Sequence, residues 1–318
     1  MEKVYVAGAI PEVGLKLLQE HFDVVDMYEG DGLIDKDTLI EGVKDATALI
    51  SLLSTNVDQD VIDAGNKLKV IANYGAGFNN VDIEYARDKG IDVTNTPKAS
   101  TNATADLTIG LVLAVARRIV EGDELSRTKG FDGWAPLFFR GREVSGKTIG
   151  VIGLGEIGSA VAKRARAFDM DVLYTGPHRK EEKEHDIGAK YVDLDTLLKN
   201  ADFITINAAY SPKLHHLIDT EQFKIMKPTA YLINAARGPI VYEEALVQAL
   251  KDKEIEGAAL DVYEFEPKIT DELKSFSNVV LTPHIGNATF EARDMMSRIV
   301  ANAAISASKG ETLQFIVN

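Results

Sequence analysis

Short apolar runs recur along the chain, and segments long enough for helices separate them. In the first third, strands are expected at residues 4–7, 24–27, 48–53, 70–73 and 92–93, with helices between them such as 12–20 and 83–89. Strands that alternate with helices in this way are typical of a parallel α/β sheet. The first third therefore predicts one α/β unit.

The second half of the chain repeats the alternation. Strands are expected at residues 148–152, 172–174, 203–207, 230–234, 257–260 and 279–282. Residues 101–120 form a long helical stretch between the two series, and an Ala-rich amphipathic helix is expected at 288–309. If the second series binds a dinucleotide, this last helix is expected to pack back onto the first series.

A glycine-rich stretch, Gly153-Leu154-Gly155-Glu156-Ile157-Gly158, follows the apolar run 148–152 and precedes a helical pattern. In a strand, turn and helix of this kind, Gly153 permits the turn, Gly155 lets a pyrophosphate approach the backbone, and Gly158 allows close packing. The free N–H groups at the start of the helix would face the phosphates. A bare motif is equally a turn without a ligand, but its position here favours dinucleotide binding.

Composition narrows the possible partners. The chain has 318 residues, enough for two domains, and its net charge of −14 argues against nucleic acid because phosphate binding needs clustered Lys and Arg. It has no cysteine, which excludes disulfides, thiolate nucleophiles and cysteine-ligated metals and is compatible with a reducing cytoplasm. No metal site is predicted. The N-terminal residues lack a signal-peptide layout, and the apolar run 109–116 is too short to cross a bilayer, so no membrane partner is expected.

Three segments of the second half place reactive side chains directly after apolar runs. Arg237 follows 232–236, and its planar fork could bind a carboxylate, although a surface ion pair is the commoner role. The second segment is the acidic loop 261–267, and the alternative to a functional role for it is a solvated turn. His284 lies between Pro283 and an apolar residue, which makes it a candidate acid or base. The other five histidines lie in polar contexts that favour solvated or structural roles.

These motifs together resemble the D-isomer-specific 2-hydroxyacid dehydrogenases over nearly the whole length of the chain. The resemblance rests on residues 153–158, 233–238, 260–262 with 266–267, and 283–286 with 288–289. Within that family the chain is most similar to glyoxylate/hydroxypyruvate reductases, through residues 52–54, 133–134, 136–137 and 173–176.

The resemblance implies a mechanism built on three residues. His284 would donate a proton to a 2-oxo group as NAD(P)H delivers hydride, and Glu266 would bond the other ring nitrogen and favour the imidazolium. Arg237 would hold the substrate carboxylate. Ala235 would contact the cofactor, and Asp261 would bind the nicotinamide carboxamide, unless it is a simple turn acid.

The resemblance also implies a fold of two Rossmann-like or flavodoxin-like domains with parallel sheets and an active site in the cleft between them. Residues 1–98 and 288–318 would form the substrate domain, and residues 99–287 the dinucleotide-binding domain. Backbone N–H groups of Ala76 and Gly77 would cradle the substrate carboxylate, and Leu52 would limit the room for its side chain. Asn79 stands where the family usually has aspartate, which leaves the charge at that end of the loop in doubt.

The end of the second strand of the dinucleotide domain predicts the cofactor. NAD-specific proteins place an acid there to bind the ribose hydroxyls, but this strand ends in Thr175 and Gly176. We therefore expect NADPH to be preferred, with NADH possible, and Arg179 to contact the 2′-phosphate with help from the Thr175 hydroxyl. Glutamates at 181, 182 and 184 weaken this expectation, as does the alternative that Arg179 only starts a solvated helix.

Assembly and function leave alternatives open. A homodimer is expected with residues 101–139 at or near its interface, because the apolar helix 109–116 is accompanied by an aromatic cluster at 131–139 in a loop that would otherwise be exposed. The aromatic cluster could instead cover a cleft within one chain.

A methyltransferase also has a glycine-rich loop after its first strand, but that function would not predict Arg, Glu and His at three strand ends. A phosphoglycerate or other D-2-hydroxyacid dehydrogenase and a nucleotide-sensing protein remain alternatives, and neither the preferred 2-oxo acid nor the physiological direction follows from the sequence.

Overall fold

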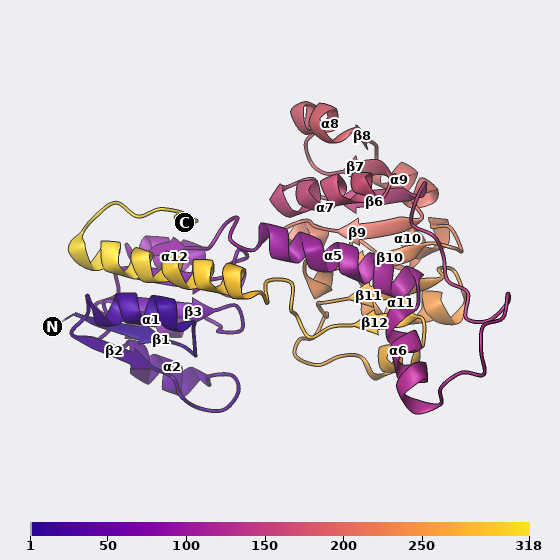
Figure 1. The fold of residues 1–318 in the computed structure, drawn as a ribbon. Helices are drawn as coiled ribbons and strands as arrows, with labels where there is room; N and C mark the ends of the chain where they lie inside the picture. The colour runs from indigo at the N-terminus through magenta and orange to yellow at the C-terminus, as the bar shows by residue number, and fades with distance from the viewer. Residues whose placement is uncertain (1) are drawn as a thin grey trace. The chain divides into compact units, whose positions relative to one another are not determined.

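A computed structural model describes residues 2–318 of the chain (Figure 1). It divides into two compact units. The first comprises the residues up to Ser100 together with Asn287–Asn318, and the second is Thr101–Gly286. The boundaries expected from the sequence are after residues 98 and 287.

The first unit is built on a five-stranded parallel sheet with the strand order β2-β1-β3-β4-β5. Its strands are β1 (Lys3–Val6), β2 (Val24–Met27), β3 (Ala48–Leu52), β4 (Val70–Tyr74) and β5 (Asp92–Thr94). The connecting helices are α1 (Glu12–Gln19), α2 (Lys36–Val43), α3 (Gln59–Ala64) and α4 (Ile83–Asp88). This strand order is that of flavodoxin-like folds.

The C-terminal helix α12 (Phe290–Lys309) belongs to the core of this first unit. It lies along α1 in Figure 1, where it is drawn in yellow. Its buried Val300, Ala304 and Ile305 pack with residues of β1, β3 and β4. Thr289 caps its first turn, and Gly310, at φ +70°, ends it in the left-handed conformation that glycine adopts freely.

The second unit is built on a seven-stranded parallel sheet with the strand order β12-β11-β10-β9-β6-β7-β8. Its strands are β6 (Thr148–Ile152), β7 (Asp171–Thr175), β8 (Ala189–Tyr191), β9 (Phe203–Ile206), β10 (Tyr231–Asn234), β11 (Gly257–Leu260) and β12 (Val279–Leu281). Its helices are α5 (Thr101–Ala116), α6 (Ile119–Thr128), α7 (Glu156–Ala167), α8 (Glu181–Ile187), α9 (Leu194–Asn200), α10 (Thr220–Ile225) and α11 (Glu243–Lys251). Both sheets are parallel throughout, which confirms the predicted α/β class.

The sequence of strands in the second sheet reverses beside β6. β6 pairs with β7 on one side and with β9 on the other, so the chain winds outward in both directions from this point. In doubly wound sheets, ligands bind outside the carboxyl ends of the strands at this switch point. The glycine-rich stretch at residues 153–158 follows β6 directly.

The long helix expected at 101–120 is two helices. Arg118 has φ +55°, in the left-handed region, and it separates α5 from α6. The run 109–116 is buried, because Ile109, Val112 and Val115 lie in the core of the second unit. Exposed large apolar residues of residues 101–139 lie further along, in α6 and in the segment between α6 and β6: Ile119, Val120, Phe131, Trp134, Leu137 and Phe138. Within residues 2–318, no helix has the length and apolar character needed to cross a membrane.

Candidate active site

The glycine-rich loop after β6 has the geometry of a phosphate cradle. Gly153 has φ +95°, and a Cβ there would lie 2.8 Å from the backbone of Ala208. A Cβ at Gly158 would lie 2.0 Å from the carbonyl oxygen of Gly153, so the helix and the turn touch at that position. A Cβ at Gly155 would meet no atom within 4 Å. The loop is therefore closed toward the protein and open at Gly155, at the start of α7, where a pyrophosphate would fit.

The remaining members of the predicted loop, Glu156 and Ile157, are the first two residues of α7. The Nζ atom of Lys183 lies 3.3 Å from the carbonyl oxygen of Gly155 and 3.4 Å from Oε1 of Glu156. The sequence analysis did not single out Lys183. Its ammonium group adds a positive charge beside the loop.

Strand β10 delivers Arg237 to the carboxyl edge of the same sheet. The buried side chain of Asn234 braces the turn, because its Nδ2 donates to the carbonyl of Arg237 at 3.0 Å and its Oδ1 accepts from the N–H of Ala236 at 3.1 Å. At Gly238 a Cβ would lie 1.8 Å from the carbonyl oxygen of Tyr263. Only glycine fits this contact, which places Arg237 beside the loop that follows β11.

The Arg237 guanidinium lies in a largely desolvated position. Burial lowers the pKa of Arg237, and the negative charge of Glu266 acts in the opposite direction. Its Nη1 donates to the carbonyl of Ala236 at 2.8 Å, which orients the planar group. Because arginine stays protonated in proteins, the site holds a fixed cation suited to an anionic ligand.

His284 and Glu266 form a hydrogen-bonded pair near this cation. Nδ1 of His284 lies 2.9 Å from Oε2 of Glu266, and the other carboxylate oxygen accepts from the N–H of Tyr263 at 2.9 Å. Burial raises the pKa of Glu266, but the bonds from His284 and Tyr263 and the charges of His284 and Arg237 together lower it below its ordinary value. Glu266 is therefore ionised at neutral pH, and it leaves Nε2 as the ring atom of His284 that can exchange a proton with a ligand.

Asp261 supports the backbone of His284, a role that the sequence analysis missed. His284 has φ +52°, which is an unfavourable conformation for a residue with a Cβ. The Asp261 carboxylate is 1 % exposed, and it accepts from the Thr282 hydroxyl at 2.7 Å and from the N–H groups of Ile285 and Gly286 at 2.8 Å each. Burial raises the pKa of Asp261, and these donors oppose that change. Asp261 thus holds the chain just after His284.

A second pair of acids fixes the loop that carries Glu266. Oε1 of Glu243 accepts from the N–H of Glu264 at 2.7 Å, and Oε2 of Glu264 accepts from the N–H of Glu243 at 3.0 Å. Nε2 of His216 lies 2.7 Å from Oε1 of Glu264. These bonds join the start of α11 to the segment after β11. Neither Glu243 nor His216 was a candidate from the sequence, because only the fold brings them to this loop.

The end of β7 carries the residues expected to select the cofactor. Thr175 ends the strand, and a Cβ at Gly176 would meet no atom within 4 Å. Arg179 is in place near this end, but it is not an isolated cation: its Nε and Nη2 donate to the carboxylate of Glu184 at 2.8 and 2.9 Å. Ala235, the remaining predicted cofactor contact, is the first residue after β10.

The predicted substrate contacts of the first unit lie at the carboxyl ends of its strands. Leu52 ends β3 and packs over Gly8, where a Cβ would lie 2.6 Å from it. The carbonyl of Ala76 accepts from Nδ2 of Asn95, and that of Gly77 from Nδ2 of Asn73, both at 2.8 Å. Among residues 2–318, no hydrogen bond uses the N–H groups of Ala76 and Gly77.

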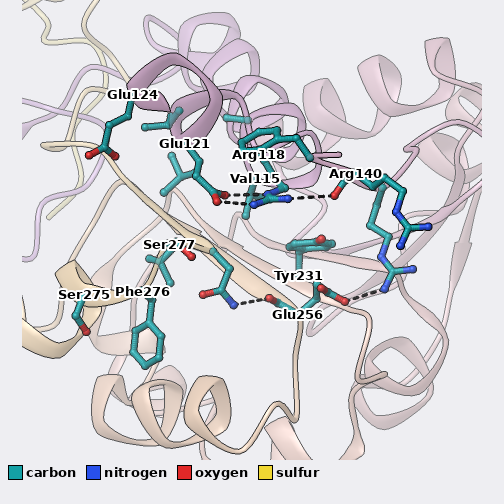
Figure 2. A pocket seen from close by; sticks show the side chains of 18 of the residues that line it. Val115, Arg118, Glu121, Glu124, Arg140, Tyr231, Glu256, Ser275, Phe276 and Ser277 are labelled. Atoms are coloured by element: carbon teal, nitrogen blue, oxygen red, sulfur yellow. Dashed lines mark hydrogen bonds and ion pairs between the residues drawn. The ribbon is translucent and has the colours of Figure 1, made fainter. Parts of the chain in front are cut away.

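A separate pocket of about 860 Å³ lies at the opposite edge of the second sheet (Figure 2). Tyr231, the first residue of β10, lines it, so it lies at the amino ends of the strands while Arg237 follows the carboxyl end. Arg118 pairs with Glu121 and Arg142 with Glu256 along its walls. It contains none of the three predicted catalytic residues. Residues 2–318 hold no group of three or more His, Asp or Glu side chains arranged for a metal ion.

Comparisons with known proteins identify the family of this chain. Residues 109–286 match the family model of the D-isomer-specific 2-hydroxyacid dehydrogenase NAD-binding domain. A protein of Staphylococcus aureus (strain USA300), named provisionally as a 2-hydroxyacid dehydrogenase, is 88 % identical over 318 residues and is covered completely, as is this chain.

Two solved reductases share the fold. A glyoxylate reductase from Paecilomyes thermophila has a TM-score of 0.88 and 31 % identity, covering 99 % of this chain and 98 % of the other. An NADPH-dependent glyoxylate/hydroxypyruvate reductase from Sinorhizobium meliloti, in complex with NADP and malonate, has a TM-score of 0.85 and 30 % identity, covering 99 % and 96 %. The chain belongs to the D-isomer-specific 2-hydroxyacid dehydrogenases, a family of oxidoreductases that use a nicotinamide nucleotide.

Proposed function

We propose that this protein reduces a small 2-oxo acid, glyoxylate or hydroxypyruvate, to the D-2-hydroxy acid with NADPH, and with NADH as the less favoured cofactor. The observation that carries the proposal is the His284–Glu266 pair beside the desolvated Arg237, at the edge of the sheet where the glycine loop opens. The substrates named for the two similar reductases support the choice of 2-oxo acid.

The residues of the second unit divide the chemistry between them. When bound, the reduced nicotinamide supplies a hydride to the carbonyl carbon. His284 gives the proton on Nε2 to the carbonyl oxygen, and Glu266 stabilises the imidazolium until then through Nδ1. Arg237 binds the carboxylate and polarises the neighbouring carbonyl, which places positive charge where negative charge develops. Asp261, for which a nicotinamide contact is also proposed, keeps His284 in its left-handed conformation.

The first unit is proposed to contribute substrate contacts. The N–H groups of Ala76 and Gly77 suit a carboxylate, because side chains of Asn73 and Asn95 hold their carbonyls away. Leu52 is proposed to limit the size of the substrate side chain.

Oxidation of the reduced nucleotide tests the proposal. We expect purified protein to oxidise NADPH with glyoxylate and with hydroxypyruvate, and to yield the D-isomer of glycerate from hydroxypyruvate. Faster turnover of phosphohydroxypyruvate would favour a phosphoglycerate dehydrogenase. Nucleotide binding without turnover of any 2-oxo acid would favour a nucleotide-sensing protein.

The proposed preference for NADPH rests on the end of β7. Gly176 stands where a ribose-binding acid would repel a 2′-phosphate, and Arg179 lies nearby. Comparing kcat/KM for NADPH and NADH in the wild type and in Arg179→Ala tests it. A wild type that favours NADH would contradict the proposed preference.

We also propose that the protein forms a homodimer through residues 101–139. Four large apolar side chains between α6 and β6 support this, because Phe131, Trp134, Leu137 and Phe138 are 64, 86, 76 and 46 % exposed. A monomeric mass by light scattering at micromolar concentration would refute the dimer. Location in the cytoplasm remains a prediction from the cysteine-free sequence.

A further inference from the structure

The ion pair between Arg179 and Glu184 differs from an ordinary surface pair in its geometry. Arg179 donates from Nε and Nη2 to the two oxygens of Glu184 at 2.8 and 2.9 Å, so one edge of its planar fork is fully occupied. The third nitrogen, Nη1, lies 3.8 Å from Glu181. The Arg179 side chain is 56 % exposed, whereas that of Glu184 is 14 % exposed. The glutamate is therefore the fixed partner and the arginine the accessible one.

Tyr174 fixes Glu184 to the sheet. Its ring is completely buried in β7, and its hydroxyl donates to Oε1 of Glu184 at 2.6 Å. The same hydroxyl accepts from the N–H of Lys180 at 2.7 Å. The bonds from Arg179 and then from Tyr174 lower the pKa of Glu184 to about 2, so its negative charge persists at all physiological pH values. Tyr174 of β7 and Arg179 after it thus meet at the Glu184 carboxylate, and the N–H of Lys180 joins them through the Tyr174 hydroxyl.

We propose that Glu184 is a residue that determines nucleotide selectivity, because it occupies and neutralises the arginine that a 2′-phosphate would use. This inference rests on the proposed use of NAD(P)H and goes beyond it by naming the residue that limits discrimination. A 2′-phosphate that reaches Arg179 must displace the carboxylate or share the fork with it. A ribose 2′-hydroxyl carries no charge and meets no such competition.

The balance of charges decides the direction of the effect. Glu184 contributes order, since it holds Arg179 near the end of β7, and it contributes a negative charge beside the phosphate. The loss of positive charge at Arg179 outweighs the gain from its fixed position. Arginine selects a phosphate through two parallel hydrogen bonds, and Glu184 accepts two such bonds from Arg179. Glu184 therefore keeps NADH usable by a site that lacks the ribose-binding acid.

Direct binding of adenosine nucleotides to the full-length protein tests this without turnover. The ratio of the dissociation constants of 5′-AMP and 2′,5′-ADP, measured by calorimetry, isolates the 2′-phosphate. In Glu184→Gln the amide oxygen can still accept from Tyr174, while the charge is gone. We expect this variant to shift the ratio toward 2′,5′-ADP by about 2- to 5-fold, within the range for ion pairs near the surface. Glu182→Gln removes an exposed charge from the same helix and should change the ratio less than twofold.

A second variant shows whether the effect passes through Arg179. In the Arg179→Ala background, Glu184→Gln should shift the ratio by less than half as much in free energy, because no fork remains to be released. An unchanged or reduced ratio in Glu184→Gln, or an equal shift in both backgrounds, would overturn the assignment. A wild type that prefers 5′-AMP would refute the NADPH preference alone, since the shift is measured against the wild type. Failure to bind either nucleotide would refute both.

Discussion

Two regions along the carboxyl edge of the second sheet hold charged residues in different ways. Around β10 to β12, two supporting carboxylates are enclosed: Asp261, 1 % exposed, accepts from two backbone N–H groups, and Glu243, 3 % exposed, accepts from one. At the end of β7, Arg179 is 56 % exposed, is held by the carboxylate of Glu184 on the next helix and lies 3.8 Å from that of Glu181. Geometry built from backbone bonds positions a proton donor rigidly. A site built from exposed ion pairs can change its ligand preference through a single substitution, because the fold does not depend on those pairs.

Removing the planar guanidinium of Arg237 should have a large effect on catalysis. Arg237→Lys keeps the positive charge but loses the planar pair of donors, so we expect kcat/KM to fall by about 10²- to 10³-fold. Steady-state kinetics with hydroxypyruvate would measure this, with NADPH affinity as the control. Normal kcat/KM in this variant would contradict Arg237 as the substrate anchor.

A methyl group added at Gly238, the residue after Arg237, should reduce stability. Gly238→Ala would place a methyl group 1.8 Å from the carbonyl oxygen of Tyr263, so the two loops must move apart. We expect the free energy of unfolding in urea to fall by about 1–3 kcal/mol.

Gly110→Ala is the matched control, because a Cβ at Gly110 in α5 would meet no atom within 4 Å. It should stabilise the protein slightly, by about 0.5–1 kcal/mol, since alanine is the better helix residue. Equal effects of the two substitutions would show that the contact at Gly238 is not close.

A smaller effect is expected from the charge of Glu266. Because the pKa of Glu266 is lowered in the fold, its ionised form stabilises the protein above the ordinary pKa of the group. That contribution is lost as the pH falls through the folded pKa. Glu266→Gln should therefore lose less stability than the wild type as the pH falls below about 4, the ordinary range of the group, as measured by urea unfolding.

The same variant should also slow reduction. Without the carboxylate, Nδ1 of His284 loses its charged partner, so kcat/KM with hydroxypyruvate at neutral pH should fall. Glu182→Gln, which removes an exposed charge far from His284 in sequence, should leave kcat/KM unchanged. An unchanged kcat/KM in Glu266→Gln would show that Glu266 does not act on His284.

The sequence predicted the parts of the site that depend on strand ends. Arg237, Glu266 and His284 each follow an apolar run, and parallel strands bring their carboxyl ends to one edge, so their proximity could be expected. The glycine loop could be predicted for a similar reason, because it lies between one strand and one helix that are adjacent in the chain.

Contacts between distant segments could not be predicted. Asp261 binds N–H groups 24 and 25 residues away, and Glu243 binds one 21 residues away, with no local pattern to announce either. The break at Arg118 and the three-residue strand β8 were also missed. Glu184 was recognised as a nearby negative charge, but its bidentate pairing with Arg179 depends on how the chain turns after β7.

The central claim is that His284 transfers the proton in reduction of a 2-oxo acid. Single-turnover oxidation of bound NADPH by hydroxypyruvate, in the wild type and in His284→Ala, tests it most directly. The account predicts a rate about 10²- to 10⁴-fold lower in the variant, with the dissociation constant of NADPH unchanged. An unchanged rate at neutral pH would contradict it.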